Sequence, residues 1–196
     1  MTEIKVLKNV LDANRQLALT NRRRFEELGL FVVNVMGSPG AGKTFLLEAT
    51  LRALGSRFRI GVVVGDICTT RDAERLRLGG QIPVVQICTE AFGGDCHLAA
   101  HMVKEAIAEL EITKLDMIIV ENVGNLVCPA EFELGEDRKV VVLSVAEGED
   151  KPEKYPLMFR VCDATVLGKI DLVPHLDYDV ALARESIRSV KADMRV

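Results

Sequence analysis

The chain alternates between short apolar runs and longer stretches with helical spacing. The apolar runs are rich in Val and Ile and contain few polar residues, which is typical of strands buried on both faces of a sheet. We expect six such strands, at residues 31–36, 59–66, 82–88, 115–121, 139–145 and 164–168. Helices are predicted between them at 45–54, 96–110 and 178–192, with the start of a further strand at 194–196. This alternation favours an α/β fold with a mostly parallel central sheet and helices on both of its faces.

A helical stretch without Gly or Pro precedes the first strand, from about residue 6 to residue 28. Its apolar residues recur at helical spacing, which predicts one buried face. The residues of that face are Val6, Val10, Ala13 and Leu17. Gly29 is a suitable stop for this helix. Since no linker or repeat interrupts the chain, we expect one domain over 1–196, with the helical segment at 1–29 and the sheet at 30–196.

A glycine-rich loop joins the first strand to the next helix. Residues Gly37–Thr44 read GSPGAGKT, a full match to the phosphate-loop pattern G-x-x-x-x-G-K-[ST] in its strand–loop–helix setting. Backbone N–H groups would face phosphate oxygens, with Lys43 on the β- and γ-phosphates and the Thr44 hydroxyl on Mg²⁺. The alternative is a glycine turn with a chance Lys-Thr pair. The expected nucleotide contacts are Gly37, Ser38, Pro39, Gly40, Ala41, Gly42, Lys43, Thr44 and Phe45.

Acidic residues follow two other strands, at the edge where open α/β sheets bind ligands. Glu121 opens an acid-x-x-Gly segment that ends at Gly124. In phosphate-loop proteins such an acid holds Mg²⁺, and the glycine N–H meets the γ-phosphate. Asp66 is a second candidate, for Mg²⁺ or the attacking water, and Asp72 is a weaker one, although each acid could instead cap the next element. Lys43, Asp66 and Glu121 form the expected catalytic set.

The end of the sixth strand resembles the guanine-reading Asn-Lys-x-Asp segment of GTPases. It reads Gly168-Lys169-Ile170-Asp171. The carboxylate of Asp171 could accept hydrogen bonds from two donors of guanine that adenine lacks, and an unpaired carboxylate would disfavour adenine. The stem of Lys169 could pack on the base, while Gly168 stands where the usual Asn would brace it. A Lys-x-Asp turn after a strand is the alternative.

Thiol and imidazole groups gather at a second stretch. Asp95 is a suitable N-cap for the helix predicted next, which would place Cys96 in the first turn, where the helix dipole favours thiolate. His97 and His101 would then lie four residues apart on one helix face. Cys128 follows the fourth strand. Thiolate with imidazole suits Zn²⁺ or Ni²⁺, and the alternatives are an exposed His pair on a capped helix or a Cys96–Cys128 disulfide.

Composition narrows the class of protein. The net charge of −4 and the absence of Trp argue against binding to nucleic acid. The N-terminal residues do not begin a signal peptide, and no apolar run reaches the roughly 20 residues of a membrane helix, so we expect no membrane association. The five cysteines, an odd number without a C-x-x-C pair, favour a reducing cytoplasm.

In combination, these motifs resemble the HypB family of GTPases, which help to insert nickel into [NiFe]-hydrogenase. The resemblance covers nearly the whole chain through Gly37–Thr44, Gly93–His97, Glu121–Pro129 and the pair Lys169 and Asp171. It implies a three-layer phosphate-loop NTPase fold of the signal-recognition/MinD/BioD class that hydrolyses GTP with Mg²⁺. It also implies a homodimer that forms with nucleotide, and a hydrogenase maturation protein and the hydrogenase large subunit as partners.

The same resemblance implies a Ni²⁺ or Zn²⁺ site at the dimer interface. Cys96, His97 and Cys128 would form it, and His101 could join as an extra ligand. Cys128 lies four residues beyond Gly124, so a loop that senses the γ-phosphate would also move a metal ligand. The Cys-Pro-His motif of the related urease nickel GTPases is absent from the sequence.

Departures from the family pattern leave alternatives open. No Cys-rich or His-rich stretch stands before the phosphate loop, so nickel is expected at the interface site or from a partner. The Ser-Ala-Lys segment expected after the last strand is absent, so either the sequence stops short of it or the base contact is made otherwise. No Gln stands in the acid-x-x-Gly segment, which predicts slow hydrolysis. A nucleotide-switched metal-storage protein and a phosphate-loop small-molecule kinase are the alternative functions.

Overall fold

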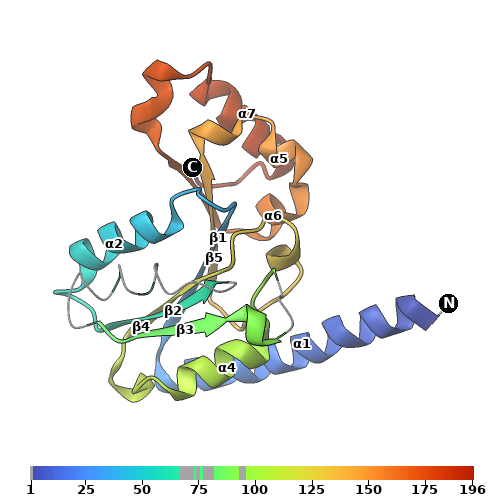
Figure 1. Ribbon diagram of the computed structural model, residues 1–196, viewed down its shortest axis with the longest axis vertical. Helices are drawn as coiled ribbons and strands as arrows, with labels where there is room; N and C mark the ends of the chain where they lie inside the picture. The colour runs from blue at the N-terminus through green and yellow to red at the C-terminus, as the bar shows by residue number, and fades with distance from the viewer. Residues whose placement is uncertain (1, 67–72, 74–75, 77–81, 93–95) are drawn as a thin grey trace.

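A parallel sheet forms the centre of the molecule (Figure 1). The computed structural model describes residues 2–66, 73, 76, 82–92 and 96–196, and within these ranges the sheet has six strands in the order β3-β2-β4-β1-β5-β6. The strands are β1 (Phe31–Gly37), β2 (Ile60–Asp66), β3 (Val84–Cys88), β4 (Met117–Glu121), β5 (Arg138–Ser144) and β6 (Ala164–Gly168). Residues 194–196, predicted to start a strand, make a single parallel bridge between Arg195 and Ala164. The predicted parallel α/β fold is confirmed.

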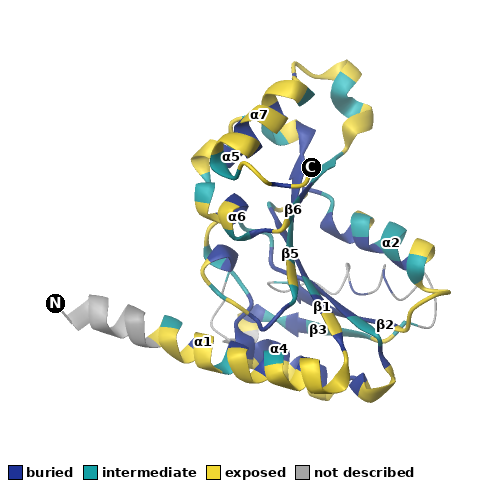
Figure 2. Cartoon of the chain, turned by 180° about the vertical axis from the view of Figure 1, so that it is seen from behind, coloured by how far each residue is buried: buried dark blue, intermediate teal, exposed yellow. Residues whose placement is uncertain are grey.

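Helices cover both faces of the sheet, and the strands between them are largely buried (Figure 2). The described α-helices are α1 (Thr2–Leu28), α2 (Lys43–Leu54), α4 (Ala100–Ala108), α5 (Lys151–Lys154), α6 (Pro156–Val161) and α7 (Val180–Val190). Val32 of β1 packs with α1 and α4 on one face, whereas Val35 packs with α2 on the other. Since side chains alternate between the faces of a strand, apolar residues at both positions bury β1 on both sides.

The buried face of α1 differs from the predicted one. The helix ends beside Gly29, as expected, but Val10 is 49% exposed, Ala13 is exposed and Leu17 is only partly buried. The side chain of Val6, the fourth residue of the predicted face, lies outside what the structure describes. The buried positions are Asn14, Ala18, Asn21 and Phe25. Although α1 has 27 residues, neither it nor any other described helix combines the length and apolarity needed to cross a membrane.

Two asparagines explain which face of α1 is buried. Asn14 accepts from the N–H of Ala100 at 2.8 Å and donates to the carbonyl of Glu133 at 2.8 Å. Asn21 donates to the carbonyls of Ala100 and Leu134, each at 2.9 Å. Buried polar groups are tolerated when they are hydrogen-bonded in this way. The apolar pattern therefore predicted the wrong face, because it treats asparagine as a surface residue.

The helix expected to start at Cys96 begins instead at Ala100. Cys96 and His97 lie in a bend that precedes it. The N–H of Ala100 is capped by the side chain of Asn14 from α1, and the expected cap, Asp95, lies outside the described residues. The helix-dipole argument for a thiolate at Cys96 was therefore wrong, because this residue is not in a helical turn.

The carboxyl ends of three strands meet at one edge of the sheet. Gly37 ends β1, Asp66 ends β2 and Glu121 ends β4, which lies between the other two. Glu121 is level with Val35 on β1 and with Val64 on β2. This register brings the phosphate loop and the two predicted acids to the same place.

Candidate nucleotide and metal site

The phosphate loop lies between the end of β1 and the start of α2. Lys43, the first residue of α2, is 7% exposed and extends back over the loop. Its Nζ donates to the carbonyl oxygens of Gly37 at 3.2 Å and Ser38 at 3.1 Å. The ammonium group is therefore held where phosphate oxygens could replace these carbonyls as acceptors.

Thr44 and Glu121 form the oxygen-rich part of the site. The Thr44 hydroxyl donates to Oε1 of Glu121 at 2.8 Å, and both side chains are buried. They come from α2 and β4, which are far apart in the sequence. A carboxylate and a hydroxyl supply the hard oxygen ligands that Mg²⁺ prefers. These two residues therefore fit the Mg²⁺ ion expected from the sequence.

A cleft of about 370 Å³ joins these groups. The loop after β4 forms one wall of the cleft and packs closely on the phosphate loop. At the point of contact there is room only for glycine, since a Cβ atom at Gly124 would come within 2.8 Å of Pro39 Cα. Asp66, at the end of β2, is half-buried and also lines the cleft, whereas Asp72 lies outside the described residues. The cleft brings together Pro39, Gly40, Gly42, Lys43, Thr44, Phe45, Asp66, Glu121 and Gly124.

The predicted base-reading segment lies outside the lining of this cleft. Lys169 and Asp171 follow β6 at the same edge of the sheet, and both are exposed. Gly168 passes close to the phosphate loop, since a Cβ atom there would lie 3.2 Å from the carbonyl oxygen of Ala41. The segment is thus next to the phosphate loop, with both polar side chains accessible to a ligand.

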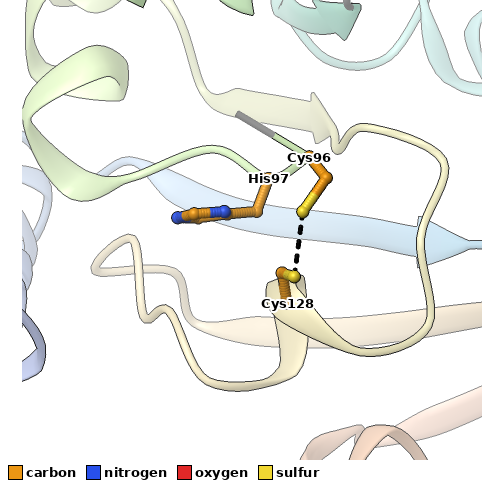
Figure 3. A group of neighbouring side chains, drawn as sticks. All are labelled: Cys96, His97 and Cys128. Atoms are coloured by element: carbon orange, nitrogen blue, oxygen red, sulfur yellow. Dashed lines mark hydrogen bonds between the residues drawn. The ribbon is translucent and has the colours of Figure 1, made fainter. Parts of the chain in front are cut away.

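Cys96, His97 and Cys128 form a cluster where two loops meet (Figure 3). One potential ligand atom from each residue lies within 4.8 Å of the other two. The Cys96 thiol donates to the sulfur of Cys128 at 2.9 Å, and the two cysteines point toward each other from the two loops. Because a disulfide bond is about 2.05 Å long and both residues are free thiols, the structure does not adopt the disulfide alternative.

The contact between the sulfurs affects the ionisation of Cys128. Because two adjacent thiols do not both ionise easily, the contact with Cys96, and then burial, raise the pKa of Cys128, while a hydrogen bond from the Asn125 side chain acts in the opposite direction. Thiolate is the form that binds a metal, so a divalent ion would displace the thiol protons. Thiolates with an imidazole are donors that Ni²⁺ and Zn²⁺ accept readily. The cluster therefore fits a borderline divalent ion such as Ni²⁺ or Zn²⁺, bound with release of protons.

The two histidines of this stretch have different surroundings. The His97 ring packs against Phe132, with ring centroids 3.8 Å apart and an angle of 36° between the planes. His101 is exposed on α4 and does not belong to the cluster among the described residues. Because His97 precedes the helix, the four-residue spacing does not place the two imidazoles on one helix face, and that prediction was wrong.

Comparison with known proteins identifies the family. The model of the CobW/HypB/UreG nucleotide-binding domain matches residues 31–196. The hydrogenase maturation factor HypB of Azotobacter vinelandii is 49% identical over 193 residues, which are 98% of this chain and 62% of that protein. A probable HypB of Methanocaldococcus jannaschii is 36% identical, over 98% of this chain and 86% of its own length. The chain belongs to the HypB family.

Solved structures of the HypB family agree with this fold. The crystal structure of HypB from Helicobacter pylori in complex with nickel superposes with a TM-score of 0.86 at 40% identity, covering 93% of this chain and 84% of that one. The signal recognition particle receptor FtsY of Elizabethkingia anophelis, at 16% identity and a TM-score of 0.57, shares the fold alone. The chain spans about three-fifths of the length of the Azotobacter HypB proteins.

Three asparagines at the site of this HypB-family chain belong to no motif that the sequence reveals. Asn122 and Asn125 lie in the loop after β4, between Glu121 and Cys128. Asn34 is fully buried within β1 and accepts from the Asn122 side chain at 3.2 Å. Asn34 could have been noticed in the sequence as a polar residue inside an apolar strand, because a buried amide needs a partner.

Proposed function

We propose that this chain is the nucleotide-binding part of a GTP-hydrolysing metallochaperone that assists nickel insertion into [NiFe]-hydrogenase. One observation carries the proposal: a single loop runs from Glu121, bonded to Thr44, to Cys128 of the metal cluster. The printed names of the relatives, and the nickel complex of the Helicobacter protein, support it. A phosphate site and a thiolate site that share one loop provide a route for coupling hydrolysis to metal release.

In the proposed reaction, water attacks the γ-phosphorus of GTP in line, and the bond from that phosphorus to the β–γ bridging oxygen breaks, which gives GDP and phosphate. Lys43 and the loop N–H groups bind the β- and γ-phosphate oxygens, and Asp66 orients the water. Thr44 and Glu121 hold Mg²⁺, which supplies charge neutralisation at the phosphates when bound. No Gln is available in the acid-x-x-Gly segment to orient the water, so we expect slow turnover.

Guanine is the base that we assign to this site. The carboxylate of Asp171 accepts from guanine, and the stem of Lys169 packs on the base. The close approach of Gly168 to Ala41 supports this assignment, because it keeps the segment beside the phosphate loop.

Nickel is the proposed cargo, held as Ni²⁺ by Cys96, His97 and Cys128, which would also accept Zn²⁺. We place this site at the interface of a homodimer that forms with nucleotide. Val127, next to Cys128, supports an interface here because its apolar side chain is 54% exposed. A hydrogenase maturation protein and the hydrogenase large subunit would then be the partners, in the cytoplasm.

The test separates the two ligands by mutation of the purified protein. Lys43→Ala should lose GTP binding and keep nickel, whereas Cys96→Ala and Cys128→Ala should lose nickel and keep GTP. GTP should bind more tightly than ATP. Metal and nucleotide stoichiometry, with the mass in solution in GTP and in GDP, measure these outcomes. Unchanged nickel affinity in both cysteine variants would refute the metal site. If a single-turnover assay detected no phosphate release, the GTPase activity would be refuted and the alternative of a metal-storage protein would be favoured.

A further inference from the structure

The segment that carries Cys96 and His97 is held by side chains from the loop after β4. Asn125 Nδ2 donates to the carbonyl oxygen of Cys96 at 3.3 Å. Asn122 Oδ1 accepts from the backbone N–H of Leu98 at 3.1 Å. The two bonds lie on either side of His97. Residues 96–98 are therefore hydrogen-bonded at both ends to the loop after β4, and the same loop continues to Cys128.

The point of contact at Asn122 is firmly anchored. Glu136 is 4% exposed, and its carboxylate accepts from Asn34 Nδ2 at 3.0 Å and from the N–H of Leu134 at 2.7 Å. A carboxylate only accepts, so Asn34 must present its nitrogen to Glu136 and its oxygen to Asn122. Asn122 must then turn its own oxygen toward the N–H of Leu98. This buried chain of side chains allows a single amide orientation and makes Asn122 a fixed point.

The point of contact at Asn125 is connected to the phosphate loop. Its backbone N–H donates to the carbonyl oxygen of Gly37 at 3.1 Å, the same oxygen that accepts from Lys43 Nζ. Its side-chain oxygen accepts from the N–H of Val127 at 2.8 Å, next to Cys128. The Gly37 carbonyl thus has two donors, Lys43 Nζ and the N–H of Asn125. When Lys43 turns to bind a phosphate, this carbonyl loses Lys43 and keeps Asn125. Any shift of that carbonyl is therefore passed directly to Asn125.

We propose that Asn125 transmits the nucleotide state of the phosphate loop to the metal ligands, with Asn122 as the fixed point against which it acts. A shift of Asn125 moves the Cys96 end of segment 96–98, while the Leu98 end stays in place, so the spacing of Cys96 and Cys128 changes. Both asparagines are positioning residues and do not bind the metal themselves. The inference rests on the proposed function, since it requires that the chain binds both nucleotide and nickel.

The experiment measures nickel affinity in two nucleotide states. Nickel is titrated into the full chain and followed by thiolate-to-nickel absorption, once with GDP and Mg²⁺ and once with a non-hydrolysable GTP analogue and Mg²⁺. The ratio of the two dissociation constants measures the coupling. In Asn125→Ala this ratio should move toward one by about two- to tenfold, the effect of one net hydrogen bond. Asn125→Asp keeps the acceptor for Val127 but lacks the donor for Cys96, and it should behave in the same way.

A matched control separates transmission from general loosening. Like Asn125, Asn14 has a side chain that donates one hydrogen bond to the backbone and accepts one from it, but its partners are Glu133 and Ala100, and Asn14→Ala removes both bonds. This variant should keep the wild-type ratio. The inference would be overturned by any of three results. These are a ratio of one in the wild type, an unchanged ratio in both Asn125 variants, or a change in Asn14→Ala equal to that in the Asn125 variants. Wild-type protein that binds no nickel would instead refute the proposed function, and the inference with it.

Discussion

The Thr44 hydroxyl is a single group that we expect to have a large effect on GTP affinity in Mg²⁺. It donates to Oε1 of the buried Glu121 carboxylate and is the proposed oxygen ligand of Mg²⁺. Thr44→Val keeps the shape of the side chain and removes this hydroxyl. We expect GTP affinity in Mg²⁺ to fall by about tenfold or more, since a bond to a charged group contributes about 1.5–3 kcal/mol. Affinity in EDTA should change little. Titration of a fluorescent GTP analogue with and without Mg²⁺ measures both quantities.

Thr50→Val provides the comparison on the same helix. The hydroxyl of Thr50 donates to the carbonyl oxygen of Leu46 at 2.8 Å, within α2 and away from the lining of the cleft. This variant should keep the Mg²⁺ dependence of the wild type. If both threonine variants lose Mg²⁺-dependent affinity to the same extent, the assignment of Thr44 to the metal is wrong.

The docking of α1 is a property of a whole element that depends on a few polar contacts. Asn21, which is 3% exposed, donates to the carbonyls of Ala100 and Leu134 and so joins α1 to the start of α4. Asn21→Ala leaves both carbonyls without this donor, so we expect the free energy of unfolding to fall by about 1–3 kcal/mol. Urea denaturation measures the change. Gln16→Ala, at an exposed position of the same helix, should be neutral, and an equal loss there would contradict the role of Asn21.

Local patterns predicted most elements of the fold. A run such as that of β1 is apolar at successive positions because both of its faces are covered, and this is visible in the residues themselves. The start of α4 was not predictable in the same way, since its cap is Asn14, 86 residues away in the sequence. The buried face of α1 was missed for the same reason. In both places a distant polar partner decides the structure.

In the candidate site, too, local motifs were predictable from the sequence and contacts between distant residues were not. The phosphate loop is a continuous motif, so its position between β1 and α2 followed from the sequence. The types of residue in the cluster of Cys96, His97 and Cys128 suggested a metal, but the helical geometry assumed for them was wrong. The roles of Asn122 and Asn125 depend on which backbone groups lie opposite them, and only the folded chain provides that information.

On the scale of the whole molecule, the loop after β4 both lines the cleft at the phosphate loop and carries Cys128 of the cluster with Cys96 and His97. In the proposed function, nucleotide and nickel therefore belong to one thermodynamic cycle. If the GTP-bound state changes nickel affinity by some factor, nickel must change the preference for GTP over GDP by the same factor. Reported couplings between two sites are about 5- to 150-fold, which is large enough to measure. The proposed dimerisation would add a dependence on protein concentration, so all titrations are made at one concentration.

The resulting prediction concerns nucleotide binding with the metal present. The dissociation constants of GDP and of a non-hydrolysable GTP analogue are measured with and without saturating nickel, and their ratio should change by the factor found in the nickel titrations. Cys128→Ala removes a proposed metal ligand and leaves the lining of the cleft intact, so nickel should no longer affect the ratio in this variant. Because reciprocity is required by thermodynamics, unequal factors would mean that nickel also binds elsewhere. A nickel effect that persists in Cys128→Ala would place its origin outside the cluster.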